Sequence, residues 1–331
     1  MKEIVLTGIK PSGKPHLGNY FGMIKPALDL VDEGQTLYFI ADYHALTTVK
    51  VSGNLNRQVY EVAATWLALG LNPERVIFYR QSDIPEVFEL TWILSCFAAK
   101  GLLNRAHAYK TAVEANLETN RDPDADINAG LYNYPVLMAA DILLFGTRFV
   151  PVGQDQKQHL EIARDIAAAM NTNCGPVLHL PEPLIRDDAM TIPGVDGRKM
   201  SKNYGNTIPI FAEPAVVRKR VMQIKTDSKK PGEPKNPEEC NVFAIYRHVA
   251  PPAAVKTTRR LYEQGGLSYH TIKDELAGIL EERFGPLRST YETFLKDCRQ
   301  IDQILTEGAV KARRIAVPVI NNIRKKIGIR R

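Results

Sequence analysis

Residues 4–19 have the sequence IVLTGIKPSGKPHLGN, which passes from an apolar, β-branched stretch into a turn rich in proline and glycine. We expect a buried strand over 4–9 and a helix that begins near His16. A strand, a turn and a helix in this order aim free backbone N–H groups and the positive end of the helix dipole at one place, which favours phosphate. The spacing G-x-x-x-x-G-K-[ST] is missing, so the turn is not a P-loop.

The same alternation of strands and helices continues along the first two thirds of the chain. Short β-branched and aromatic runs at 37–41, 76–79 and 149–152 alternate with helical patterns, the order typical of a parallel α/β sheet. In one such helix, residues 59–69 carry an apolar stripe that includes Trp66 and ends before Gly70. After about residue 210 only helical patterns remain. The sequence therefore predicts a Rossmann-like, parallel-sheet nucleotide-binding domain followed by an all-helical carboxyl-terminal domain.

The two parts are joined by residues 186–209, a stretch rich in glycine that we expect to form a mobile loop. It contains Lys199, Met200, Ser201, Lys202 and Asn203. Two lysines on either side of a hydroxyl can neutralise a diphosphate leaving group while a loop closes over it.

Composition excludes several classes of protein. The 331 residues (37.0 kDa) contain 44% hydrophobic and 24% charged residues, the range of an ordinary folded enzyme. The apolar run in 1–9 is too short for a signal peptide, and no other run is long enough to span a membrane, so we expect a cytoplasmic protein. The four cysteines lie far apart, which argues against a zinc or iron–sulfur site, and we expect buried thiols.

The net charge of +6 is concentrated at the carboxyl end. Residues 311–331 carry eight lysines and arginines and no acidic residue, which leaves 35 basic side chains against 37 acidic ones elsewhere. A basic segment of this kind suits RNA, but it is also typical of a solvated helix face. Charge alone does not separate these two interpretations.

Asp141 lies in a largely apolar helical pattern over 136–145, where a carboxylate needs a partner. It could accept the N–H of an aromatic ligand such as tryptophan, or it could form an ion pair with an arginine. Met138 lies one helical turn earlier and shares that face.

Residues 11–19 resemble the HIGH signature, and residues 199–203 resemble the KMSKS signature, of class I aminoacyl-tRNA synthetases. The segments 134–141 (YPVLMAAD) and 150–159 (VPVGQDQKQH) look like those of the tryptophanyl branch of bacterial type, and the likeness covers nearly the whole chain. It implies an enzyme that activates L-tryptophan with ATP to tryptophanyl-adenylate and then transfers tryptophan to the 3′ end of tRNA(Trp).

The resemblance also implies roles for individual residues. His16, Lys199 and Lys202 would be catalytic. The residues that would bind ATP, supplied with Mg²⁺, are Lys10, Ser12, His16, Gly18, Asn19, Gly153, Gln154, Asp155, Met190, Lys199, Met200, Ser201, Lys202 and Asn203. Those that would bind tryptophan are Gly8, His44, Tyr134, Met138, Asp141 and Gln156. No metal site formed by the protein itself is expected.

The likeness further implies a catalytic domain over 1–210, with a connecting dimer-interface region at about 85–135 and the loop at 186–209. Residues 211–331 would form a helical domain that binds the tRNA anticodon. Within the connecting region, residues 96–110 resemble the family's dimer interface, so we expect a homodimer.

Two positions depart from the family pattern. Lys10 stands where tryptophanyl members commonly have glutamine, and we hypothesise that its charge tightens binding of ATP or of the substrate carboxylate and alters sensitivity to tryptophan-like inhibitors. Asn203 replaces the usual final serine, and either side chain can cap a turn.

Three other interpretations compete. A tyrosyl enzyme also needs a deep polar acceptor, although residues 138–141 are tryptophanyl in type and no additional carboxyl-terminal RNA-binding module follows. A small-metabolite nucleotidyltransferase can share both signatures, but the helical third and the basic end argue against it. A non-enzymatic RNA-binding paralogue could lose the phosphate-binding groups, which here are present.

Overall fold

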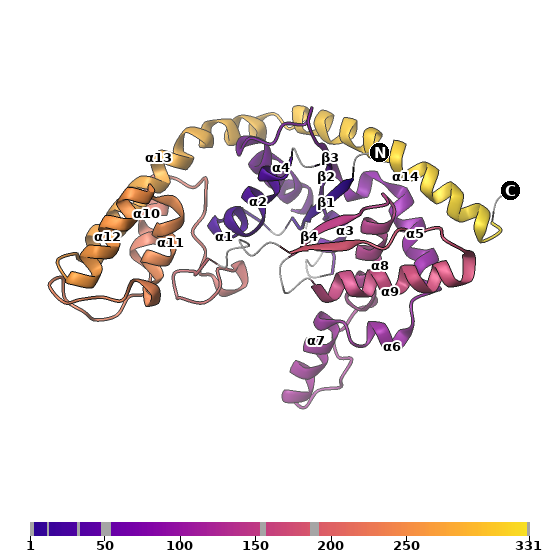
Figure 1. Cartoon of the computed structure of the whole chain (residues 1–331), viewed down its shortest axis with the longest axis horizontal. Helices are drawn as coiled ribbons and strands as arrows, with labels where there is room; N and C mark the ends of the chain where they lie inside the picture. Colours follow the sequence, from indigo (N-terminus) through magenta and orange to yellow (C-terminus); the bar gives the residue numbers. More distant parts are fainter. Residues whose placement is uncertain are drawn as a thin grey trace.

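The computed structural model of the chain describes residues 3–11, 13–31, 34–47, 54–152, 157–185 and 192–329. Its centre is a sheet of five parallel strands in the order β3-β2-β1-β4-β5 (Figure 1). The strands are β1 (Ile4–Ile9), β2 (Gln35–Ile40), β3 (Ile77–Arg80), β4 (Phe149–Val152) and β5 (Glu182–Ile185). The predicted parallel α/β architecture is confirmed.

Four of the strands lie where the alternating pattern placed them, and one was not predicted. β1 and β4 have the expected bounds, and β2 and β3 differ from the prediction by one or two residues. β5 was missed because its four residues, EPLI, include a glutamate and Pro183 and form no β-branched or aromatic run. A proline cannot donate to a neighbouring strand, and β5 tolerates it because it is the edge strand beside β4.

The strand order reverses at β1, which has β2 on one side and β4 on the other. In an open parallel sheet, ligands bind beyond the carboxyl ends of the strands at such a reversal. Residues that follow Ile9, Ile40 and Arg80 therefore lie at the edge of the sheet where a site is expected.

Helices cover both faces of the sheet. Those before residue 210 are α1 (Leu17–Asn19), α2 (Lys25–Asp29), α3 (Asp42–Ala45), α4 (Leu55–Ala68), α5 (Pro85–Ser95), α6 (Lys100–Leu103), α7 (His107–Glu118), α8 (Ala129–Leu143) and α9 (Lys157–Cys174). A π-helical stretch over Tyr20–Ile24 joins α1 to α2, and 3-10 turns occupy Gln81–Asp83, Lys202–Tyr204 and Pro237–Glu239. After residue 210 come α10 (Pro214–Met222), α11 (Asn241–Val249), α12 (Pro252–Gln264), α13 (Tyr269–Lys296) and α14 (Arg299–Lys326), and the described part of this region contains no strand.

Alternate residues of the strands β2 and β3 belong to different cores. In β2, Tyr38 and Ile40 join the core that contains α4 and α13, whereas Leu37 and Phe39 join the core that contains α5, α8 and α9. α4 begins at Leu55 and is followed by Gly70 with a φ of 101°, as the apolar stripe and glycine predicted. Trp66 is fully buried in that helix, so its prediction as a core residue is confirmed.

The last helix returns to the sheet and covers its free edge at β3 (Figure 1). Ala309, Ala312 and Ala316 are buried on the face that α14 presents to the α5 and α8 core. A Cβ atom at Gly308 would lie 1.7 Å from the carbonyl oxygen of Phe78, so this closeness of helix and strand requires glycine.

Part of the basic carboxyl-terminal segment is used inside the chain. Arg313 pairs with the buried Glu86, with Nη2 2.6 Å from Oε1, and Arg324 pairs with Glu89. Both acidic partners belong to α5, so these two arginines secure α14 to the sheet domain. The last two arginines of the segment lie outside the described residues, and the division of the chain at residue 210 stays a prediction.

The expectation of four buried thiols was wrong in part. Cys240 is buried, Cys174 and Cys298 are half-buried, and Cys96 is exposed. Cys96 closes the carboxyl end of α5, whose outer face also carries the exposed Trp92.

None of the helices in the described residues has the length and apolar character needed to cross a membrane. Over the same residues, no three His, Cys, Asp or Glu side chains form a group that could hold a metal ion.

We predict that Gly308→Ala lowers the free energy of unfolding by about 1–3 kcal/mol, because the added methyl group meets the rigid backbone of β3. Gly278→Ala is the matched control, since Gly278 lies in α13 with open space around it, and alanine should raise stability by about 0.5–1 kcal/mol there. Urea titrations followed by circular dichroism measure both. Equal stability of the two variants would contradict the docking of α14 on β3.

Candidate functional site

The first signature lies directly after β1. The chain leaves the sheet at Ile9 and enters α1 at Leu17, with His16 as the capping residue. The amide oxygen of Asn19 accepts a hydrogen bond from the backbone N–H of His16 at 3.2 Å. Asn19 thus closes the first turn of its own helix.

The His16 imidazole is 5% exposed, and its Nδ1 has no hydrogen-bond partner among the described residues. Burial, together with a smaller contribution from the nearby charge of Lys202, lowers the pKa of His16 to about 4. The ring is therefore neutral at physiological pH and retains polar capacity for a ligand.

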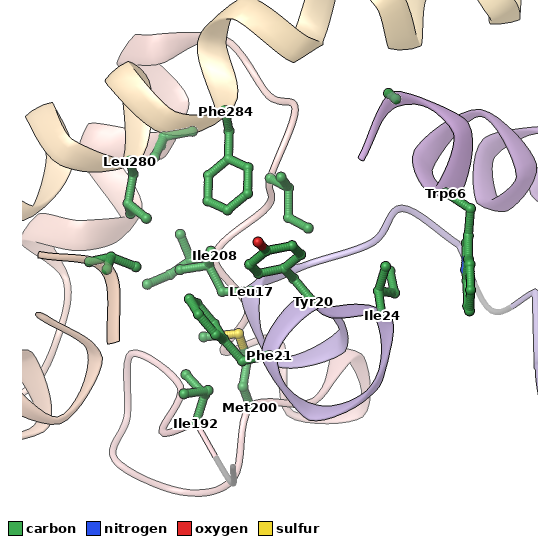
Figure 2. Packing of buried hydrophobic residues seen from close by; sticks show 14 of the residues in the cluster. Leu17, Tyr20, Phe21, Ile24, Trp66, Ile192, Met200, Ile208, Leu280 and Phe284 are labelled. Carbon is green, nitrogen blue, oxygen red and sulfur yellow. The ribbon is translucent and has the colours of Figure 1, made fainter. Parts of the chain in front are cut away.

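The second signature is seated on the first by backbone contacts. Leu17 N–H donates to the carbonyl of Ile208 at 3.0 Å, and His16 and Pro209 form an isolated antiparallel bridge. Met200 is buried, and its sulfur accepts from Gly18 N–H at 3.3 Å. In Figure 2, Met200 lies beside Ile192 and Phe21 within this cluster. Two segments some 180 residues apart therefore form one structural unit.

Lys202 reaches back across this junction. Its ammonium group donates to the carbonyl oxygen of Gly13 at 2.6 Å. Burial lowers the pKa of Lys202 to about 8, and the negative charge of Glu61 opposes part of that shift. Lys199 is exposed on the same loop. The junction thus brings the half-buried ammonium group of Lys202 and a neutral imidazole to the turn that follows β1, an arrangement suited to an anion.

The side chain of Asn206 holds the loop together, a role that the sequence did not predict. The side chain of Asn206 is buried, donates to the carbonyl of Lys199 at 3.1 Å and to Asp196 at 2.7 Å, and accepts from Ser201 N–H at 2.7 Å. Ser201 in turn accepts from the backbone N–H of Asn203 at 3.3 Å, so the serine caps this turn. An asparagine directly after Gly205 was the only signal in the sequence.

A second cluster surrounds Asp141, which lies in α8 and is fully buried. His44 Nε2 lies 2.9 Å from Oδ2, and Gln81 Nε2 lies 2.9 Å from both carboxylate oxygens. Burial raises the pKa of Asp141, and the hydrogen bonds from His44 and Gln81 oppose that rise. Among the residues that the structure describes, the partners of Asp141 are therefore a histidine and a glutamine in place of the alternative arginine, and the carboxylate keeps capacity for another donor.

Gln81 is the second residue that sequence reasoning missed. It follows β3 directly, and its amide oxygen accepts from Tyr43 N–H at 3.2 Å while its amide nitrogen donates to Asp141. These two bonds fix the orientation of its side chain. Its position at the carboxyl end of a strand next to β2 was the available clue.

Aromatic rings lie over Gly8 in β1. A Cβ atom at Gly8 would come 2.5 Å from the ring of Phe39, and that ring stacks on Tyr79 with centroids 5.7 Å apart. Gly8 has no side chain, and the ring of Phe39 therefore occupies the space beside it. Met138 is half-buried against the same core.

Two further predicted residues make contacts of their own. The hydroxyl of Tyr134 bonds to Nε2 of the buried His159. Lys10 Nζ donates to Thr47 Oγ1 at 3.2 Å, and Thr47 donates to the carbonyl of His44 at 2.8 Å. Lys10 is thereby linked to the segment that carries the Asp141 partner, and burial lowers the pKa of its ammonium group.

Several predicted site residues lie outside the described residues: Ser12, Gly153, Gln154, Asp155, Gln156 and Met190. The described ones fall into two clusters. One combines the neutral His16 with Lys202 and the exposed Lys199, and the other presents the carboxylate of Asp141. The first suits an anion such as phosphate, and the second suits an N–H donor.

Comparisons with known proteins agree with one another. A family model described as tRNA synthetases class I (W and Y) matches residues 2–285. A tryptophan–tRNA ligase of Pseudomonas aeruginosa is 48% identical and matches 100% of this chain and 75% of its own length. One of Neisseria meningitidis is 46% identical over 99% of this chain and 98% of its own. The solved structure of a tryptophanyl-tRNA synthetase of Campylobacter jejuni with ADP and tryptophan has a TM-score of 0.88 and 42% identity, covering 98% of this chain and 99% of that one.

We predict that Gln81→Met lowers the free energy of unfolding by about 1–3 kcal/mol at pH 8, because a buried carboxylate loses a donor. Without that donor the folded-state pKa of Asp141 rises further. A carboxyl group whose pKa is higher in the folded state than in the unfolded state makes the folded protein more stable as the pH falls. The loss should therefore be smaller at pH 5.

Urea titrations at the two pH values measure this difference. Gln303→Met, at an exposed glutamine of α14 that bonds Glu307, is the control and should stay within about 0.5 kcal/mol of the wild type. A loss at Gln81 that is independent of pH would contradict the assigned role of Asp141.

Proposed function

We propose the following function for this chain, which belongs to the family of class I tRNA synthetases specific for tryptophan and tyrosine. It is an aminoacyl-tRNA synthetase of the tryptophanyl branch, which activates L-tryptophan with ATP, releases pyrophosphate and transfers the tryptophanyl group to tRNA. The structural observation that supports this best is the seating of the 199–203 signature on the 10–19 signature.

ATP would bind at that junction. His16 would donate from its neutral ring to a phosphate oxygen, and the Gly18 and Asn19 segment would face the nucleotide. Lys199 and Lys202 would hold the charge of the β- and γ-phosphates, and Mg²⁺ would arrive with ATP as part of the substrate. By family resemblance, Ser12, Gly153, Gln154, Asp155 and Met190 would complete this half, with Met200, Ser201 and Asn203 on the loop.

Tryptophan would bind at Asp141. The indole N–H can only donate, and an ionised carboxylate can only accept. Three hydrogen bonds from His44 and Gln81 orient the two oxygens, and one acceptor position of the nominal four remains for the ligand. Gln81 thus joins the predicted set of Gly8, His44, Tyr134, Met138, Asp141 and Gln156 as a positioning residue.

The reaction then follows from positioning and charge. An oxygen of the tryptophan carboxylate attacks the α-phosphorus of ATP, a bond forms between them, and the bond from the α-phosphorus to the bridging oxygen breaks to release pyrophosphate. In the second step the 2′-hydroxyl of the terminal adenosine of tRNA attacks the carbonyl carbon, and AMP leaves. Neither step needs a nucleophile from the protein, so the lysines act by stabilising the developing negative charge.

We also propose the partners and the cellular location of the enzyme. The tRNA would be tRNA(Trp), bound through the helical region 211–331, and the enzyme would act in the cytoplasm. A homodimer is supported by the apolar surface at the start of the connecting region, where Trp92 is 73% exposed. The exposed Tyr43 of α3 adds to this surface, and its ring lies tilted against that of Phe88 with centroids 4.3 Å apart. Lys10 would add a cation beside the substrate carboxylate, as hypothesised.

The decisive test is amino-acid-dependent exchange of labelled pyrophosphate into ATP, with each of the 20 amino acids offered separately in the presence of Mg²⁺. We expect exchange with tryptophan alone. Asp141→Asn should raise the KM for tryptophan about tenfold or more, because a charged hydrogen bond contributes about 1.5–3 kcal/mol. Exchange with tyrosine would overturn the role of Asp141, and no exchange with any amino acid would favour a metabolite transferase or a non-enzymatic paralogue.

The pH dependence of the same exchange tests Lys202. Its lowered pKa of about 8 means that the free enzyme loses this cation as pH rises through 8. We expect kcat/KM for ATP to fall above pH 8, approaching about tenfold per pH unit. Lys202→Arg should move the fall to higher pH, because the guanidinium stays charged. Lys25→Arg, at an exposed lysine of α2 that pairs with Asp29, should keep the fall near pH 8.

A further inference from the structure

One arginine of the helical region contacts the helix of the first signature. Arg283, in α13, donates from Nη2 to the hydroxyl of Tyr20 at 3.0 Å. Its guanidinium carbon lies 5.4 Å from the Tyr20 ring centroid, 5.9 Å from that of Phe21 and 5.8 Å from that of Phe284. The rings of Tyr20 and Phe284 meet edge to face at 5.1 Å (Figure 2).

Within the described part of the chain, Arg283 forms no ion pair with a carboxylate. Arg288, one turn and a half further along α13, differs in this respect because it forms a two-pronged pair with Glu281. The guanidinium of Arg283 is instead surrounded by aromatic rings, which attract a cation through their faces. Its contacts therefore serve the junction between α13 and residues 20–21.

Tyr20 and Phe21 begin the π-helical stretch Tyr20–Ile24, where Lys25 N–H bonds to the carbonyl of Tyr20. The α-helix resumes at Lys25, so Pro26 falls in a first turn, where its missing N–H is not needed. π-helical turns are rare, and they are frequent at functional sites. This one follows directly on the segment from His16 to Asn19.

The same turn contacts the second signature on its other side. Phe21 belongs to the buried cluster that contains Ile192, Met200 and Ile208, and Figure 2 shows Phe21 between Phe284 above and Met200 below. The Tyr20–Phe21 turn therefore lies between Arg283 on α13 and the loop that carries Lys202.

We propose that Arg283 is a positioning residue for ATP binding. It fixes the Tyr20–Phe21 turn by one hydrogen bond and by contacts with the two rings of that turn, and through the turn it sets His16, Gly18 and the seat of Met200. This inference rests on the proposed function, because it assigns ATP to the junction of the two signatures. Loss of the contact should weaken ATP binding more than tryptophan binding, since the Asp141 cluster is built from α3, α8 and the end of β3.

The experiment uses the full-length enzyme in tryptophan-dependent pyrophosphate exchange, with ATP and tryptophan varied separately. We expect Arg283→Met to raise the KM for ATP threefold to tenfold and to leave the KM for tryptophan within twofold. Arg283→Lys, which keeps a cation over the rings, should recover part of the loss. Tyr20→Phe should raise the KM for ATP, and combining it with Arg283→Met should give less than the product of the two effects. Arg288→Met is the matched control on α13 and should leave the KM for ATP within twofold.

The outcomes separate the two proposals. A wild-type enzyme that exchanges with no amino acid overturns the proposed function, whatever the variants do. A wild-type enzyme that exchanges with tryptophan, together with an Arg283→Met variant whose KM for ATP is unchanged, overturns the role of Arg283. Equal rises in both KM values, or a fall in kcat alone, indicate a purely structural role and also overturn it. If Arg283→Met does not fold, an unchanged KM for ATP in both Arg283→Lys and Tyr20→Phe has the same meaning.

Discussion

The contact between residues 16–18 and residues 200–209 is the constraint on which the candidate ATP site depends. The backbone bond from Leu17 to Ile208 and the bridge between His16 and Pro209 hold it without any ligand. Because the contact excludes water, it also sets the electrostatics. Burial lowers the pKa of both His16 and Lys202, so the imidazole is neutral and the ammonium group is readily deprotonated.

The buried carboxylate of Asp141 follows a different physical rule. An arginine could have occupied both oxygens in a bidentate pair and left little capacity for a ligand. Gln81 and His44 instead supply directed hydrogen bonds, and the raised pKa of Asp141 reflects the burial that they compensate only in part. A carboxylate held in this way is oriented, and it remains able to accept from one more donor.

The sequence predicted what depends on local patterns and missed what depends on tertiary packing. The runs that became β1 to β4 and the helix over Leu55–Ala68 carry enough alternation or helical spacing to be recognised. β5 (EPLI) has no β-branched or aromatic run, and its pairing with β4 decides its structure. Gln81 and Asn206 could not be assigned from spacing, because their partners Asp141 and Lys199 reach them only through the fold. From the sequence, Arg313 was likewise assigned to a basic segment, but in the structure it pairs with Glu86.

The lowered pKa of Lys202 also bears on what the loop does when ATP is present. The seated loop holds an ammonium group that burial disfavours, and the Gly13 carbonyl and the charge of Glu61 offset part of that effect. A phosphate beside it would favour the charged form and raise that pKa, since an opposite charge stabilises an ion at short range. Lys202 lies at the place where the loop contacts the first signature. An anion that favours the charged form of Lys202 would therefore also favour the contact of the loop. An anion bound at the junction would therefore strengthen the contact between the two signatures.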